Sequence, residues 1–186
     1  MNQGIPAWLR GLIEWVVVFA IALGVFGVVR IFVVEPFTVP TGSMEPTIQI
    51  GDNVLAQKVS LRAGTKVRPG DIVVFTNPDA SSDHDILVKR VIATAGQTVD
   101  LRGGAVYVDG AALEEPYAIG GSYPLSEQAP GVSMSFPYTV PEGSVWLMGD
   151  NRENSADSRY FGPVPTENLI GVVFFRYWPL DRIGTL

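Results

Sequence analysis

An apolar segment near the amino terminus constrains the fold of this 186-residue chain more than any other feature. Residues Trp15–Val29 carry no charged side chain and would span about 22 Å as an α-helix. Adding residues 30–34 extends the span to about 30 Å, which matches the hydrocarbon core of a bilayer. We therefore expect a transmembrane anchor over residues 12–34, preceded by a short tail over residues 1–11.

A cleavable signal peptide is the alternative interpretation of this segment. Ala22-Leu23-Gly24 has a small-x-small pattern, but apolar sequence continues well beyond it and runs directly into Glu35-Pro36-Phe37. This continuity favours a retained anchor. Charge sets its orientation poorly, because Arg10 on one side is opposed by Arg30 on the other.

The rest of the chain has the pattern of a mainly β domain. Short apolar runs alternate with turn signals, twenty glycines and fourteen prolines supply turns, and Asp109-Gly110 indicates a tight hairpin. We expect strands at Val54–Val59, Asp71–Thr76, Ile86–Ala93, Ala105–Val108, Val145–Met148 and Gly171–Tyr177. Residues 111–141 are less regular, which indicates an extended insertion on the sheet. One β domain over residues 35–186 accounts for the whole pattern.

Composition excludes several classes of function. A net charge of −6 without a basic run argues against nucleic acid as a partner. The absence of cysteine removes thiol nucleophiles, disulfides and the commonest zinc sites. A single histidine, His84, makes a multi-histidine metal site impossible. We expect neither a metal nor a cofactor.

Two residues far apart in the sequence are candidates for a nucleophile and its base. Ser43 lies in Pro40–Thr47, where prolines on both sides fix the backbone, although a simple turn serine has the same surroundings. Lys89 lies in the apolar run Ile86–Ile92, and strand alternation places it on one face with Leu87. A free lysine has a pKa of about 10.4, but burial lowers this value by several units and creates a base.

Two alternatives for these residues stay open at this stage. His84 would be the base of a Ser-His-Asp triad, but it lies in the acidic segment Asp79–Asp85, which is typical of a solvated loop. Lys89 would be an ordinary solvated lysine if both faces of its strand met water.

The segment Gly149–Arg159 is dense in polar residues directly after an apolar strand. Its Asp-x-Asn-x-Glu spacing hints at a calcium loop, but Arg152 and the missing loop glycine argue against one. An Asx-rich turn is the plainer interpretation. We favour a scaffold whose hydroxyl groups and Asp–Arg pair brace an active site.

Taken together, these segments resemble the type I signal peptidases, a family of Ser-Lys peptidases. The resemblance covers nearly the whole chain, from the anchor to Gly162-Pro163-Val164. Its boxes, in order, are Pro40–Thr47, Gly51–Lys58, Pro69–Phe75, the segment around Lys89, and Gly149–Arg159. The resemblance implies a compact antiparallel β-sheet catalytic domain with one N-terminal transmembrane helix.

The resemblance also implies a role for each site residue. Ser43 would be the nucleophile and Lys89 the general base. The oxyanion hole would combine the Ser43 backbone N–H with the hydroxyl of Thr41, where many relatives carry serine. Supporting roles fall to Ser155, which would orient the lysine, to the ion pair of Asp157 with Arg159, and to Asp150.

The implied task is the removal of signal peptides from exported preproteins after small-x-small (Ala-x-Ala) sites. Apolar residues would wall shallow pockets for the small side chains: Phe37, Val39, Met44, Ile48, Val74, Leu87 and Val88. The implied partners are signal peptides and membrane lipid. The implied location is the plasma membrane, crossed once, with a cytoplasmic N-terminus and the catalytic domain on the outer face.

Two competing functions keep the same fold. One is a specialised Ser-Lys peptidase that acts on one partner, and the other is a non-catalytic, anchored assembly factor. The presence of both Ser43 and Lys89 argues against the second.

Overall fold

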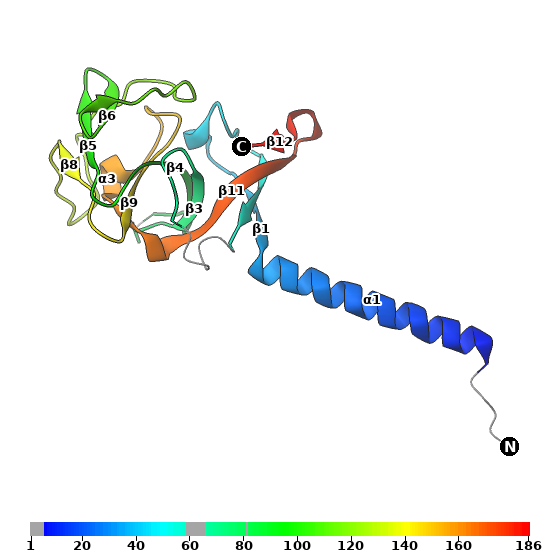
Figure 1. Cartoon of the computed structure of the whole chain (residues 1–186). Coiled ribbons are helices and arrows are strands. Elements are labelled where there is room, and N and C mark those ends of the chain that lie inside the picture. The colour runs from blue at the N-terminus through cyan, green and yellow to red at the C-terminus, as the bar shows by residue number, and fades with distance from the viewer. Residues whose placement is uncertain (1–5, 59–65, 81) are drawn as a thin grey trace.

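The structure is a computed structural model that describes residues 6–58, 66–80 and 82–186 (Figure 1). Helix α1, Ala7–Phe32, projects away from a β domain that holds the rest of the chain. Within the described residues, Trp8–Gly27 of this helix is the one segment long and apolar enough to cross a membrane, with a mean hydropathy of 2.0. The helix begins before the predicted anchor and ends before Val34, which already starts the first strand. Residues 1–5 of the predicted tail lie outside the described residues.

Two antiparallel sheets form the β domain. The larger runs in the order β1-β2-β11-β3-β4-β9-β10, with β12 paired to β11. Its strands are β1 (Val34–Thr38), β2 (Asn53–Gln57), β3 (Ile72–Thr76), β4 (Ile86–Thr94), β9 (Ser144–Met148), β10 (Val164–Pro165), β11 (Leu169–Trp178) and β12 (Gly184–Thr185). The smaller has the order β7-β6-β5-β8, with β5 (Thr98–Arg102), β6 (Ala105–Val108), β7 (Ala111–Ala112) and β8 (Tyr138–Thr139). Short helical turns lie at η1 (Gly42–Met44), α3 (Ser158–Phe161), η2 (Thr166–Asn168) and η3 (Leu180–Arg182).

The mainly β, antiparallel fold with one N-terminal helix is therefore confirmed, and each predicted strand has a counterpart. Val59, the predicted end of one strand, lies outside the described residues. Between Ala112 and Tyr138 the described chain forms turns and one isolated parallel bridge, from Ile119 to Asn151.

Strand β4 is the element that positions the site. It lies inside the larger sheet, paired with β3 on one side and β9 on the other. Leu87 and Val91, on the Lys89 face of β4, pack into a core built around Phe75 and Leu147. Val88, on the opposite face, packs against a second core. A strand covered on both faces places Lys89 among apolar side chains.

Candidate active site

The nucleophile candidate Ser43 lies at the centre of the η1 turn. Thr41 enters this turn in an extended conformation, with φ −125° and ψ 153°. All three turn residues are buried, and Ser43 keeps 8% of its surface exposed. The turn therefore leaves a small part of Ser43 accessible to solvent.

Ser43 and Lys89 meet directly in the folded chain. The Lys89 Nζ atom lies 2.7 Å from Ser43 Oγ, and it also donates to the Val88 carbonyl at 3.1 Å. Lys89 is 2% exposed. The two residues are far apart in the sequence, so this hydrogen bond is a product of the tertiary fold.

Burial lowers the pKa of Lys89 from its ordinary value of 10.5 to about 8. The charged ammonium is penalised by loss of water, whereas the carboxylates of Asp157 and Asp150 favour it and raise the pKa in part. A substantial fraction of the amine is thus neutral near pH 8. A neutral amine has a lone pair, which can accept a hydrogen bond from the Ser43 hydroxyl along the same 2.7 Å contact.

Asp157 and Arg159 form a buried, two-point ion pair. Arg159 Nε donates to Asp157 Oδ1 and Nη2 to Oδ2, each at 2.9 Å. Asp157 also caps α3 through the Arg159 N–H and accepts the Gly149 N–H at 3.1 Å. The ion pair therefore holds the end of the Gly149–Arg159 segment against its beginning, at Gly149, which directly follows strand β9.

Asp150 joins three segments of the chain. Its carboxylate accepts Arg90 Nε at 2.8 Å and Arg90 Nη2 at 2.6 Å, and also the hydroxyl of Thr47 at 2.6 Å. Arg90 follows Lys89 on β4, and Thr47 follows the nucleophile turn. This carboxylate thus ties the strand of the base to the turn of the nucleophile.

Ser155 differs from the expectation. Its buried Oγ has no hydrogen-bond partner within the part of the chain that the structure describes, so the expected bond to Lys89 is not formed. The hydroxyl lies against Gly149, where a Cβ atom would come within 2.3 Å of Ser155 Oγ and 2.5 Å of the Ser43 carbonyl. Glycine at this position lets the two segments approach each other.

Two adjoining cavities flank the Ser43 hydroxyl, with volumes of about 220 Å³ and about 210 Å³. Both are lined by Thr41, Ser43, His84 and Leu87. Among the described residues Thr41 makes no hydrogen bond that caps the turn. Its position beside Ser43 is compatible with an oxyanion donor.

Of the seven predicted pocket residues, four line the first cavity: Phe37, Val39, Leu87 and Val88. The prediction differs from the structure at Met44, Ile48 and Val74. These three are fully buried and pack together in the core beneath the site, so they line neither cavity. Local alternation does not reveal which apolar residues near a nucleophile face outward.

The second cavity is also lined by three residues for which the sequence predicted no role in the site. Asn77, Asn154 and Tyr160 line it from three different segments. His84 lies in an exposed loop, as expected, although Ser81 of that loop is outside the described residues. Lys89, not His84, makes the hydrogen bond to Ser43 among the described side chains.

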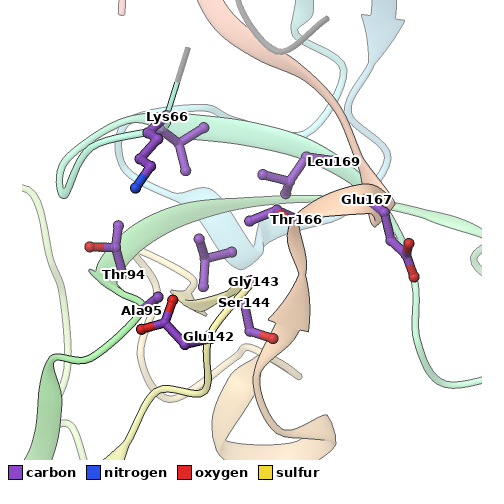
Figure 2. A pocket seen from close by; sticks show the side chains of 11 residues that line it. Lys66, Thr94, Ala95, Glu142, Gly143, Ser144, Thr166, Glu167 and Leu169 are labelled. Carbon is purple, nitrogen blue, oxygen red and sulfur yellow. The ribbon is translucent and has the colours of Figure 1, made fainter. Parts of the chain in front are cut away.

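A further cavity of about 420 Å³ lies elsewhere on the domain. Figure 2 shows Lys66, Glu142 and Glu167 around it, with the Ser144 hydroxyl directed away from Lys66. Residues 59–65, which precede Lys66, lie outside the described residues. Ser43 lines both of the smaller cavities, and Lys89 lines the second of them. The described residues also contain no cluster of three or more side chains able to hold a metal.

A buried lysine with a lowered pKa, hydrogen-bonded to a serine beside an open cavity, marks this part of the domain as a candidate hydrolase site. The family model described as "Signal peptidase, peptidase S26" matches residues 12–178. The chain therefore belongs to the signal peptidase family, and it is a serine peptidase.

Two relatives from one organism agree with this membership. The chain is 41% identical to a probable signal peptidase I-2 of Synechocystis sp., over 85% of this chain and 69% of the relative. It is 38% identical to a probable signal peptidase I-1 of the same organism, over 100% of this chain and 92% of the relative. A crystal structure of a signal peptidase I from Enterococcus faecalis V583 is 31% identical, with a TM-score of 0.43 over 57% of this chain and 96% of that one.

We expect Lys89 to lose its proton with a midpoint at about pH 8 in the folded chain. The measurement is a pH titration of the lysine ε-carbon resonances, with Lys89→Ala to assign the signal. Because the folded pKa lies below the unfolded one, the unfolded chain binds more protons between the two values. The stability penalty of burying Lys89 therefore decreases as the pH rises through this range. A Lys89 midpoint that stays near 10.5 would contradict the burial of its amine.

Proposed function

We propose that this peptidase is anchored in a membrane by α1 and removes signal peptides from exported preproteins, with Ser43 as nucleophile and Lys89 as general base. The observation that carries the proposal is the 2.7 Å contact between the two residues in a chain of the signal peptidase family. The same contact disfavours a purely structural assembly factor, since such a protein has no use for a buried, partly neutral lysine.

The geometry supports a two-step acyl transfer. Neutral Lys89 removes the proton of Ser43 as Oγ attacks the scissile carbonyl, and the resulting oxyanion binds the Ser43 N–H and the Thr41 hydroxyl. The Lys89 ammonium then protonates the leaving amine, so the peptide bond breaks and an acyl-enzyme remains. Water then attacks the ester as Lys89 removes one of its protons, and the Lys89 ammonium gives that proton to Ser43 Oγ as the acid product leaves.

The supporting residues keep this constellation in place. Asp150 and the Asp157–Arg159 pair hold the loop around the dyad through the contacts described above. In the proposed mechanism Ser155 orients the Lys89 amine when substrate binds, since its hydroxyl has no hydrogen-bond partner among residues 6–58, 66–80 and 82–186.

The cavity of about 220 Å³ suits the small side chains of an Ala-x-Ala site. Strand β1, at the edge of the larger sheet, contributes Phe37 and Thr38 to the lining of this cavity. An extended substrate added to this edge would gain main-chain hydrogen bonds and place alternate side chains in the cavities.

The path from anchor to nucleophile supports action at a membrane surface. At most about 30 Å of extended chain separates Val34 from Ser43. The apolar region of a signal peptide also ends at the membrane boundary, with its cleavage site just beyond. The proposed topology is a single pass through the plasma membrane, with the N-terminus cytoplasmic and the catalytic domain on the outer face.

Ser43→Ala and Lys89→Ala should each lower preprotein cleavage at least about a thousandfold, because each removes one half of the dyad. His84→Ala should retain most of the activity. Wild-type cleavage should rise with pH through about 8, following the neutral form of Lys89. The assay is cleavage of a secreted preprotein by the full chain in detergent. An active Ser43→Ala enzyme would refute the nucleophile, and an inactive His84→Ala enzyme with an active Lys89→Ala enzyme would replace the dyad by a triad.

Replacing either alanine of an Ala-x-Ala substrate with leucine should lower kcat/KM at least about a hundredfold, because the shallow cavities exclude the larger side chain. Leucine at the middle position is the matched control and should be tolerated, because side chains alternate along an extended peptide and this one points to the face opposite the cavities. Peptides that differ at one position provide the comparison. Equal cleavage of all three leucine peptides would contradict small-residue selection. Cleavage of one preprotein alone would favour the specialised peptidase.

An exposed apolar surface supports lipid as a second partner. At the β11–β12 hairpin, Trp178, Leu180 and Ile183 are 51%, 69% and 51% exposed. Trp178 pairs with Asn53, which pairs with Thr38 at the end of β1. The surface thus lies level with the Thr38 end of β1, two strands from the edge that α1 enters, and we propose that it rests on the bilayer.

A domain truncated before residue 35 tests this surface, because it retains Trp146 and Trp178 alone of the four tryptophans. Trp146 is fully buried, so a shift of tryptophan emission to shorter wavelength on adding phospholipid vesicles should come from Trp178. Trp178→Phe should abolish the shift, and Leu180→Ser with Ile183→Ser should weaken vesicle flotation. A wild-type domain that shows neither a shift nor flotation would contradict the proposal.

A further inference from the structure

Asn151 holds both peptide groups around the nucleophile. Its backbone N–H donates to the Ser43 carbonyl at 3.0 Å, and its side-chain Nδ2 donates to the Gly42 carbonyl at 3.2 Å. The Gly42 carbonyl and the Ser43 N–H belong to one planar, trans peptide group, so they point in opposite directions. The Gly42 oxygen also accepts the Glu45 N–H at 3.2 Å, and the bond from Asn151 adds a second restraint that holds the Ser43 N–H in the direction away from Asn151.

The insertion, residues 111–141, holds the backbone on either side of Asn151 from the side opposite Ser43. The Ile119 N–H donates to the Asp150 carbonyl at 2.8 Å, and the Arg152 N–H donates to the Ile119 carbonyl at 2.9 Å. Because backbone groups alternate along an extended segment, the Asn151 N–H is directed to the other side, where Ser43 lies. Residues 119 and 151 thus form a small brace against the nucleophile turn.

Buried charge locks this brace in place. Arg152 is 1% exposed and donates from Nη1 to Glu115 Oε2 at 2.8 Å and to Ser122 Oγ at 2.6 Å. Its Nε atom donates back to the Gly149 carbonyl at 2.9 Å. Glu115 and Ser122 lie on either side of Ile119, so the segment that supports Asn151 is fixed at both ends.

We propose that Asn151 is a positioning residue that aims the Ser43 N–H at the oxyanion of the transition state. This inference rests on the proposed function of Ser43. A hydrogen bond to the Gly42 carbonyl also polarises that peptide group and strengthens its N–H as a donor. The benefit appears as negative charge develops on the substrate oxygen, so Asn151 acts on the chemical step and has little effect on ground-state binding.

Asn151→Ala should lower kcat on the order of 10- to 100-fold with KM changed by less than about threefold, less than the loss expected for a direct oxyanion donor. The pH midpoint of kcat should stay at the wild-type value, because a neutral side chain is replaced by another. A peptide boronic acid that forms a tetrahedral adduct with Ser43 should lose affinity by a similar factor. Asn168→Ala, in the η2 turn, is the matched control and should retain wild-type kinetics and inhibition.

Asn151→Asp provides a second variant if the alanine variant does not fold. Aspartate has nearly the same size and keeps the backbone bond to Ser43, but when ionised it cannot donate to the Gly42 carbonyl. It should lose at least as much kcat as the alanine variant. Its pH midpoint should move upward, because a negative charge near Lys89 favours the ammonium.

Two comparisons separate this inference from the proposed function. Cleavage by Ser43→Ala equal to wild type would refute the nucleophile and with it both proposals. An inactive Ser43→Ala enzyme together with wild-type kcat and boronate affinity in a folded Asn151 variant would overturn the positioning role alone. Loss of kcat with unchanged boronate affinity would also overturn it, since the defect would then lie outside the oxyanion contact.

Discussion

The contact between Lys89 and Ser43 depends on keeping an amine out of water. Each unit by which burial lowers a lysine pKa corresponds to about 1.4 kcal/mol of lost stabilisation of the ammonium. The fold sustains this cost by placing Lys89 on a central strand, with apolar neighbours on its own face and hydrogen bonds to Ser43 and the Val88 carbonyl. The cores on the two faces of β4 supply the apolar surroundings that this requires.

The charges around the dyad illustrate how a site controls a buried amine. Asp157 and Asp150 lie close enough to raise the pKa of Lys89, yet each carboxylate is held at two points by an arginine. Pairing compensates much of their charge, so desolvation remains the dominant influence on Lys89. Buried ion pairs add little net stability after desolvation, but breaking one leaves an unpaired charge. These pairs therefore serve geometry above all, since they join strand β4, the turn of Ser43 and the Gly149–Arg159 segment into one unit.

The anchor and the catalytic site share one edge of the domain. Strand β1 begins two residues after α1 ends, and it runs along the sheet toward the nucleophile turn. The same strand contributes Phe37 to the cavity beside Ser43. A short connection of this kind leaves the active site little freedom to move away from the membrane, which couples the location of the enzyme to the location of its proposed cleavage site.

Local sequence indicated the apolar N-terminal helix and the positions of the strands, and it singled out Ser43 and Lys89 as candidate site residues. Apolar periodicity, prolines and a lysine inside an apolar run are local signals, and they depend only on neighbouring residues. Only the tertiary structure showed that Met44, Ile48 and Val74 are core, that the Ser155 hydroxyl has no partner among the described residues, and that Asn151 supports the nucleophile turn. Those facts depend on which distant segments meet. The neighbours of a residue in the sequence indicate the local backbone conformation and which side chains avoid water. They do not indicate which distant segments of the chain pack against that residue.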